Sequence, residues 1–174
     1  MRNPGWLNKP GVAEKNSREM EHKELWGARG EVPADSDHLV PLGKARIARA
    51  GKDLTIVAWS RMVVLACQAA EELATAGIDA EIIDLRTLQP WDCDTAFTSV
   101  RETGFLLVPQ EAVLTCGFAA EVAATVAEAL GDALKAPVRR LGAPRMPVPY
   151  APPLEDKYRI TDRHIVAIAR SMVG

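Results

Sequence analysis

Short apolar runs alternate with longer amphipathic stretches through most of this chain. Four runs have the length of β-strands and are bounded by Gly, Pro or Asp, and they lie at 54–59, 81–85, 105–108 and 137–141. Apolar residues at three- and four-residue intervals predict helices at 62–76, from Asp92 or Asp94 to about 103, at 117–130, and from Thr161 onward. Strands that alternate with helices favour right-handed crossovers. The pattern therefore predicts a three-layer α/β/α domain around a mostly parallel sheet of about five strands.

The first two strands are predicted to form a β-hairpin. Residues 44–50 alternate between polar and apolar side chains, the sequence GKD at 51–53 favours a turn, and a buried strand follows. The hairpin would add one antiparallel edge strand to the sheet. Beyond the buried strand, Ser60 is expected to cap the next helix, and Gly77 is expected to end it in a left-handed conformation.

The N-terminal part of the chain has a different character. The first 20 residues show no sustained period, and residues 30–43 contain two prolines and an acidic run. We therefore expect an irregular tail and linker over residues 1–43 and one folded domain over residues 44–174. Within that domain, residues 143–153 contain five prolines and are predicted to be extended and irregular.

Composition and charge narrow the class of protein. The chain has 174 residues, of which 48% are apolar and 25% charged, as expected for one globular domain. Residues 53–174 carry eleven Lys and Arg against sixteen Asp and Glu, a net charge of −5, which argues against nucleic acid as a partner. No apolar stretch reaches the roughly 18 residues of a membrane span. We expect a cytoplasmic protein with no membrane association and three reduced cysteines.

The loops after the predicted strands carry few candidates for chemistry. No glycine-rich phosphate-binding motif is present. Asp84 and Arg86 favour a structural ion pair or turn network over a ligand site, and Glu111 favours a loop-organising role over acid–base catalysis. Cys116 precedes a helix but has no histidine near it in the sequence, and the three histidines share no metal-binding spacing with the cysteines. No catalytic residue, cofactor ligand or metal ligand is predicted.

The predicted helix at 117–130 has an unusual composition. One face is apolar and suits a core, whereas much of the remainder is alanine, interrupted by Glu121 and Glu128. Small side chains allow close approach of another backbone, but alanine also has the highest helix propensity. Both an interface and a solvated face remain open for this helix.

Several ordered motifs resemble one family. They are EHK at 21–23, GEVP at 30–33, VPLGKA at 40–45, DLRTLQPWD at 84–92, TCGFAAE at 115–121 and PVPYAPPLE at 147–155. Over residues 21–174 the chain resembles the C-terminal domain of the β subunit of thiamine-diphosphate-dependent 2-oxo acid dehydrogenases, of the pyruvate, branched-chain or acetoin type. This domain is the transketolase C-terminal-like domain. Two departures stand out: Gln110 replaces a usual His or Glu, and Cys116 replaces a usual Gly, where a Cβ would strain a turn with positive φ.

The resemblance implies an oxidoreductase that decarboxylates a 2-oxo acid and passes the acyl group to a lipoyl arm. In that family, thiamine diphosphate and magnesium lie between the α subunit and the N-terminal domain of β. Residues 21–25 resemble only the last strand of that N-terminal domain, and the chain lacks the family's GDG…NN metal motif. We therefore expect this chain alone to bind no cofactor and to be inactive.

The resemblance also implies roles in assembly. The expected partners are the α subunit, a second β subunit in a homodimer-like contact, and the subunit-binding domain of the lipoyl acyltransferase. The residues that these roles assign to the subunit interface are Gly117, Phe118, Ala120, Glu121, Ala124 and Gly174. Two alternatives remain open from the sequence: a free-standing, non-catalytic protein-interaction module, and a flavodoxin-like small-ligand binder suggested by fold class alone.

Overall fold

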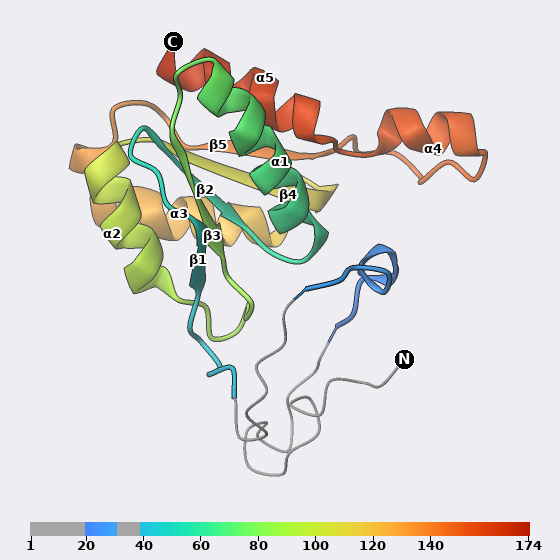
Figure 1. Ribbon diagram of the computed structural model, residues 1–174, viewed down its shortest axis with the longest axis horizontal. Helices are drawn as coiled ribbons and strands as arrows, with labels where there is room; N and C mark the ends of the chain where they lie inside the picture. Colours follow the sequence, from blue (N-terminus) through green and yellow to red (C-terminus); the bar gives the residue numbers. More distant parts are fainter. Residues whose placement is uncertain (1–19, 31–38) are drawn as a thin grey trace.

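The structure, a computed structural model, describes residues 20–30 and 39–174 (Figure 1). The predicted linker at 30–43 lies partly outside the described residues. In chain order the elements are η1 (Lys23–Leu25), β1 (Arg46–Arg49), β2 (Leu54–Ala58), α1 (Arg61–Thr75), β3 (Ala80–Asp84), α2 (Cys93–Thr103), β4 (Leu106–Val113), α3 (Phe118–Leu130), η2 (Gly131–Ala133), β5 (Arg139–Ala143), α4 (Pro152–Tyr158) and α5 (Asp162–Val173).

Five strands form one mixed sheet in the order β1-β3-β2-β4-β5. The pairs β2–β3, β2–β4 and β4–β5 are parallel, and β1 pairs with β3 in the antiparallel direction at one edge. Every residue of β2 is buried because this strand has parallel neighbours on both sides. The predicted fold class, with its mostly parallel sheet and one antiparallel edge strand, is confirmed.

The predicted hairpin is wrong, although its edge strand exists. β1 lies beside β3, with Arg46 opposite Asp84, and does not pair with β2. The backbone N–H groups of Lys52 and Asp53 both donate to the carbonyl of Asp79, which carries the chain across the end of β3. Both edges of β2 are used by parallel strands, so β1 can pair only at the far side of β3. The alternation of polar and apolar residues predicts an edge strand but does not determine which strand it pairs with.

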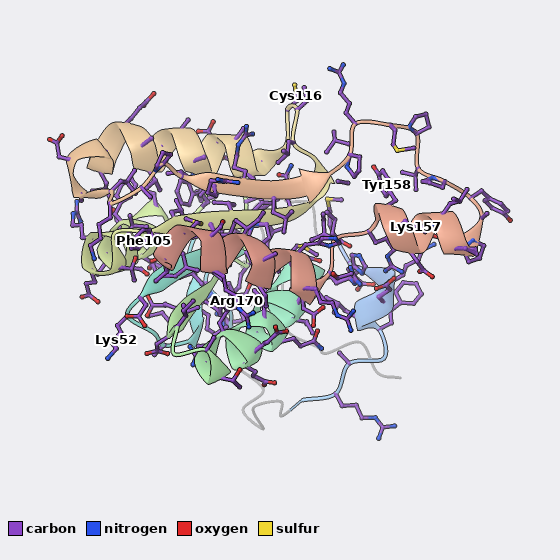
Figure 2. All side chains as sticks on the ribbon, turned by 90° about the horizontal axis from the view of Figure 1, so that it is seen from above. Lys52, Phe105, Cys116, Lys157, Tyr158 and Arg170 are labelled. Atoms are coloured by element: carbon purple, nitrogen blue, oxygen red, sulfur yellow. The ribbon has the colours of Figure 1, made fainter. Side chains whose placement is uncertain are left out.

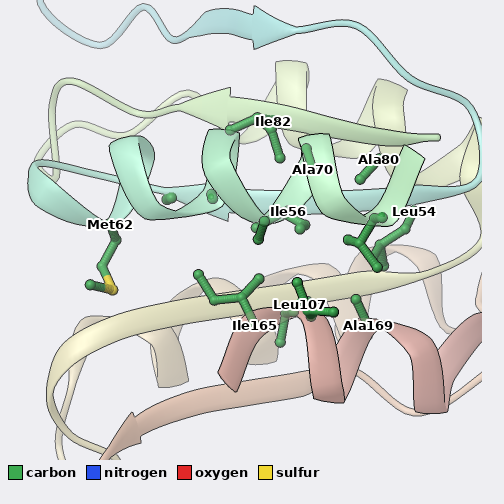
Figure 3. Close-up of a cluster of buried hydrophobic side chains, with 14 of the residues drawn as sticks. Leu54, Ile56, Met62, Ala70, Ala80, Ile82, Leu107, Ile165 and Ala169 are labelled. Carbon is green, nitrogen blue, oxygen red and sulfur yellow. The ribbon is translucent and has the colours of Figure 1, made fainter. Parts of the chain in front are cut away.

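Helices cover both faces of the sheet, as its alternating side chains require. Leu54, Ile56, Ile82 and Leu107 point to the face covered by α1 and α5 (Figure 3). The other face is covered by α2 and α3, which pack on the side chains Val57, Ile83, Leu106 and Val108.

One buried polar side chain interrupts this second face. Thr55 lies within hydrogen-bond distance of two hydroxyls of α2, 2.6 Å from Ser99 and 2.8 Å from Thr103. Each of the three hydroxyls can donate one proton and accept another, so the group is satisfied without water. The network ties α2 to the central strand at a fixed register.

The predicted helix signals vary in outcome. Asp92 caps α2, and Gly104 ends it with φ +78, as expected. Gly77 follows α1 with φ +81, which confirms the left-handed end. Ser60 precedes α1 but makes no side-chain capping bond, so its predicted role as a cap is wrong. Its backbone conformation, described below, directs the chain into the helix instead.

Two further differences concern the ends of the chain. Residues 21–25, which resemble a strand, contain the single turn η1 and belong to no strand of the sheet that the described residues form. The predicted irregular stretch 143–153 continues into the helix α4, whose first positions are occupied by prolines. Proline suits the first turn of a helix, where an N–H has no intrahelical partner. Proline density therefore marks a helix start here as well as a loop.

Asp92 caps α2 and also accepts the N–H of Ala45, which precedes the edge strand β1. It is expected to contribute strongly to the free energy of unfolding. Burial opposes its ionisation, but N–H donors from Ala45 and Thr95 and the Thr95 hydroxyl outweigh it and hold the pKa of the carboxyl below its ordinary value. Replacing Asp92 by alanine should lower the free energy of unfolding at pH 7 by about 2 kcal/mol, through the lost cap and the unpaired Ala45 N–H. Urea denaturation measures this difference.

The pH dependence follows from the sign of the same shift. Because the folded state lowers the pKa, the contribution is present above the ordinary pKa near 3.8 and is lost as pH falls through the folded-state value. The stabilities of Asp92→Ala and the wild-type protein should therefore converge in acid. A constant difference between pH 7 and pH 2 would contradict this account.

Candidate functional site

The sheet has a topological switch point between β2 and β4. β2 connects through α1 to β3 on one side, whereas β4 connects through α3 to β5 on the other. α1 and α3 also pack on opposite faces of the sheet. In open α/β sheets, ligands bind outside the carboxyl ends of the two strands at such a point. The residues that follow β2 and end β4 are therefore the first place to look for a functional site.

The turn after β2 is strained. Ser60 has φ 53° and ψ −136°, and Met62 N–H donates to the Trp59 carbonyl over 3.2 Å. These values describe a type II′ turn with Ser60 at the position that glycine normally occupies. A residue with a side chain in this backbone conformation costs about 1–3 kcal/mol of conformational free energy. Such strain is common at sites where the backbone must position a neighbouring residue. The residue placed here is Arg61.

Arg61 joins two carboxylates at the switch point. Its side chain is 17% exposed, its Nε lies 2.5 Å from Glu24, and its Nη1 lies 3.4 Å from Glu111. Glu24 belongs to residues 20–30 and also pairs with Arg159 at the end of α4. Glu111 belongs to β4. One guanidinium thus links the N-terminal segment to the carboxyl end of the sheet.

His22 completes this group. Its Nδ1 accepts the backbone N–H of Glu24 over 3.2 Å, so a neutral ring carries its proton on Nε2. Nε2 lies 3.1 Å from a carboxylate oxygen of Glu111 and donates to it. We call His22, Glu24, Arg61, Glu111 and Arg159 the edge cluster. Glu111 therefore has two partners within it, and one of them is a histidine, which the sequence does not place beside it.

A cavity of about 220 Å³ adjoins the edge cluster. Its wall includes all five cluster residues and, in addition, Val148, Glu155, Tyr158 and Ile160. Residues from the N-terminal segment, the strand ends and the α4 region meet here. The lining combines charged and apolar side chains, and the cavity lies where the switch-point rule places a ligand.

The turn between β4 and α3 is organised by Gln110. This side chain is 1% exposed; its Oε1 accepts the Ala119 N–H over 2.9 Å, and its Nε2 donates to the Val113 carbonyl over 2.7 Å. Cys116 lies at the exposed tip of the turn with φ +58° (Figure 2). The strain expected from a Cβ at this position is therefore present.

The Asp84 region has the structural role predicted for it, with a different partner. Asp84 pairs with Arg46 across β1 and β3 at 3.3 Å. Its other oxygen accepts the backbone N–H of Arg86 over 3.2 Å, so Arg86 contributes its backbone to the turn. Both contacts hold the edge of the sheet.

The interface residues suggested by the family resemblance divide into three groups. Gly117 and Phe118 serve the domain itself: Gly117 abuts Gln110, and the Phe118 ring packs edge-on against Trp59 with centroids 5.4 Å apart. Ala120 is half-buried, whereas Glu121 and Ala124 are exposed on α3. Gly174 ends α5, on the opposite face of the sheet. The structure thus groups the α3 residues and separates Gly174 from them.

An exposed apolar arm was missed by the sequence reasoning. Residues 144–158, here called the proline-rich arm, extend beyond the rest of the domain and end in α4 (Figure 1). Four large apolar side chains of the arm are exposed, namely Met146, Val148, Tyr150 and Leu154. The signal in the sequence was the alternation of proline with large apolar residues. A loop without a partner does not require such apolar residues.

Among residues 20–30 and 39–174, no three His, Cys, Asp or Glu side chains gather in a way that would hold a metal ion. Within the same ranges, no helix is both long and apolar enough to cross a bilayer.

Comparisons with known proteins agree with the fold described above. The family model of the transketolase C-terminal domain matches residues 43–165. The β subunit of acetoin:2,6-dichlorophenolindophenol oxidoreductase from Cupriavidus necator is 47% identical over 150 residues, which cover 86% of this chain and 44% of that subunit. The mitochondrial pyruvate dehydrogenase E1 β subunit of Dictyostelium discoideum is 41% identical over 136 residues, which cover 78% of this chain and 38% of that subunit.

A solved structure shows the same fold. A split-gene transketolase in an inactive β4 tetramer has a TM-score of 0.67 and 30% identity, and the match covers 80% of this chain and 45% of that one. The chain thus spans less than half the length of the relatives it matches. The matched domain, the sheet order and the ordered motifs agree, and the chain belongs to the transketolase C-terminal domain family, with dehydrogenase β subunits among its relatives.

Proposed function

We propose that this chain is the assembly domain of a thiamine-dependent oxidoreductase β subunit and does no chemistry by itself. The parent reaction would be oxidative decarboxylation of a 2-oxo acid, or the related cleavage of acetoin, with acyl transfer to a lipoyl arm. The observation that carries the proposal is the proline-rich arm. Its four large apolar side chains are each more than half exposed, as expected of a surface that a partner covers.

The exposure of the arm is large. Val148 is 64% exposed and Tyr150 is 100% exposed, while Met146 and Leu154 are each more than half exposed. Contiguous exposed apolar side chains, and tyrosine in particular, are typical of protein–protein interfaces. Because the arm is held by prolines, little conformational entropy is lost when a partner covers it.

A second surface suits a closer contact. Ala124 and Ala127 are exposed on α3, and Ala120 beside them is half-buried. Such small side chains let another helix approach closely, as in a β–β contact. The similar split-gene transketolase is described as a β4 tetramer, which supports self-association of a chain of this fold. Docking to the acyltransferase would in turn rely on electrostatic attraction to the net negative charge of residues 53–174.

The family resemblance places thiamine diphosphate and magnesium between the α subunit and the N-terminal domain of β, and residues 21–25 resemble only the last strand of that domain. Under this proposal, thiamine diphosphate and magnesium belong to other parts of the complex. The flavodoxin-like alternative rests on the fold class and on the cavity beside the edge cluster alone.

Sedimentation equilibrium tests the assembly role directly. The wild-type chain should associate with itself, and Val148→Ser/Tyr150→Ser should weaken that association by at least tenfold, because two exposed apolar anchors are lost. Val64→Ser on α1 is the matched control, since Val64 is 44% exposed outside the arm and should leave the association unchanged. Titration with the acyltransferase's subunit-binding domain at two salt concentrations tests the docking role, which should weaken with salt.

Two results would overturn the proposal. A monomeric chain that also fails to bind the subunit-binding domain would have no assembly role. Decarboxylation of a 2-oxo acid by the purified chain, supplied with thiamine diphosphate and magnesium, would remove the claim that it does no chemistry.

A further inference from the structure

The switch-point crevice is occupied by the chain itself. Glu24, from residues 20–30, lies between two guanidinium groups: Arg61 after β2 and Arg159 after α4. Arg61 is largely buried, whereas Glu24 is 45% exposed at its side chain. The two arginines thus belong to the edge of the domain, whereas the Glu24 carboxylate comes from the N-terminal segment.

We propose that Arg61 and Arg159 form an oxyanion-binding site, which Glu24 occupies as an exchangeable internal ligand. A free phosphate or dicarboxylate would take the place of the Glu24 carboxylate and release residues 20–30 from the domain edge. The guanidinium group suits this role because its planar N–H donors match the geometry of carboxylate and phosphate oxygens. The proposal is independent of the assembly role above.

Arg61 keeps a second carboxylate contact without Glu24, and Arg159 keeps its backbone position. Arg61 begins α1 directly after the strained turn at Ser60, and its Nη1 keeps a contact with Glu111 at 3.4 Å. Arg159 is the residue that ends α4, and its backbone N–H donates to the Glu155 carbonyl over 3.0 Å. Removal of the Glu24 side chain would therefore leave Arg61 in place and take away the carboxylate that bridges the two guanidinium groups.

The cavity provides room for a ligand larger than a carboxylate. Its volume of about 220 Å³ exceeds that of several water molecules, at about 30 Å³ each. The acidic groups that face it, besides Glu24, are Glu111 and Glu155. Once Glu24 leaves, the two guanidinium groups face these two carboxylates in equal number. Binding of an anion then depends on direct contact with the guanidinium groups, and not on a long-range excess of positive charge.

Residues 20–30 are attached weakly enough to exchange. η1 has three residues and none of them is buried. The Trp26 side chain is 59% exposed and its indole N–H donates to Glu21 of the same segment. The edge cluster therefore supplies much of the attachment, and segments with few buried contacts open at low free-energy cost. Figure 2 shows this segment below α4.

Phosphate titration of the folded chain tests the site. Nitrogen-15 NMR follows the arginine Nε–H signals while sodium phosphate or sodium succinate replaces sodium chloride at constant ionic strength. Glu24→Ala should bind phosphate at least tenfold more tightly than the wild-type chain, because the internal competitor is gone. Glu21→Ala is the matched control: it removes a carboxylate of the same segment that accepts the Trp26 indole N–H and lies outside the edge cluster, and it should behave as wild type.

A second variant and a second readout separate the site from general ion effects. Arg159→Gln combined with Glu24→Ala should lose the gain in phosphate affinity. Phosphate should also speed tryptic cleavage of the wild-type chain after Lys23, whereas sodium chloride at equal ionic strength should not. Tighter binding of phosphate than succinate would indicate a phosphorylated ligand, and the reverse a carboxylate ligand. Equal phosphate affinity of Glu24→Ala and wild type, or a gain that survives Arg159→Gln, would overturn the proposal.

Discussion

Replacing Gly51 by alanine is expected to lower the free energy of unfolding by about 3 kcal/mol, at the upper end of the range for overpacking substitutions. A Cβ at this position would lie 2.6 Å from the Ala80 carbonyl oxygen and even closer to the carbonyl carbon of Ala80 and the nitrogen of Glu81. These are backbone atoms of β3 and cannot rotate away. The added methyl group must therefore push the 50–53 crossing off the sheet.

Gly131→Ala is the matched control for this prediction. Gly131 has φ −49° and ψ −41°, and a Cβ there meets no atom within 4 Å. The same substitution should be neutral or should stabilise the protein by about 0.5–1 kcal/mol, because alanine has less backbone freedom in the unfolded chain. Urea denaturation of both variants gives the comparison. Equal stabilities of the two variants would show that β3 does not constrain Gly51.

Gln110→Ala is expected to cost a similar amount, about 3 kcal/mol. The substitution removes the acceptor of the Ala119 N–H and the donor to the Ala112 and Val113 carbonyls, at roughly 1 kcal/mol for each lost bond. It also leaves a space at a residue that is 1% exposed. The beginning of α3 has no other side-chain cap, so this helix end should loosen first.

Two controls define the cause. Gln68→Ala makes the same change at an exposed position of α1 and should be close to neutral. Gln110→Glu keeps the acceptor for Ala119, but an ionised carboxylate has no proton for the two carbonyls, so this variant should also be destabilised at pH 7. Hydrogen exchange at the first turn of α3, together with urea denaturation, measures both effects. A stable Gln110→Ala variant would show that the turn does not depend on this side chain.

The elements themselves were largely predictable from the sequence. Strand runs such as 54–59 and 81–85 lie within one or two residues of β2 and β3, because buried strands require continuous apolar residues. Asp92 and Gly104 mark the ends of α2 through local hydrogen bonds and local φ angles. Signals of this kind act over a few residues, and a linear sequence contains them in full.

Pairing partners and glycine roles were not predictable in the same way. The GKD sequence at 51–53 indicates a tight hairpin turn, yet Gly51 is required because its backbone approaches β3. Ser60 has the composition of a helix cap, yet the strained turn around it determines where Arg61 points. In both cases the deciding contact is with a residue far along the chain.

The candidate site shows the same division. Its five residues lie at positions 22, 24, 61, 111 and 159, and no motif spacing connects them. Only the parallel sheet, which brings the ends of β2 and β4 to one edge, makes Arg61 and Glu111 neighbours. The exposure of the proline-rich arm is likewise a tertiary fact, since the sequence alone does not say which apolar residues find a place in the core.

The sequence by itself determined the family, the α/β class and the positions of most helices and strands, because local patterns of burial, capping and ordered motifs encode them. The tertiary structure decided that β1 pairs with β3, that Gly51 and Gln110 are packing positions, and that an arginine pair at the switch point holds Glu24. These features depend on contacts between distant segments, and the free energies of such contacts exist only once the sheet has formed.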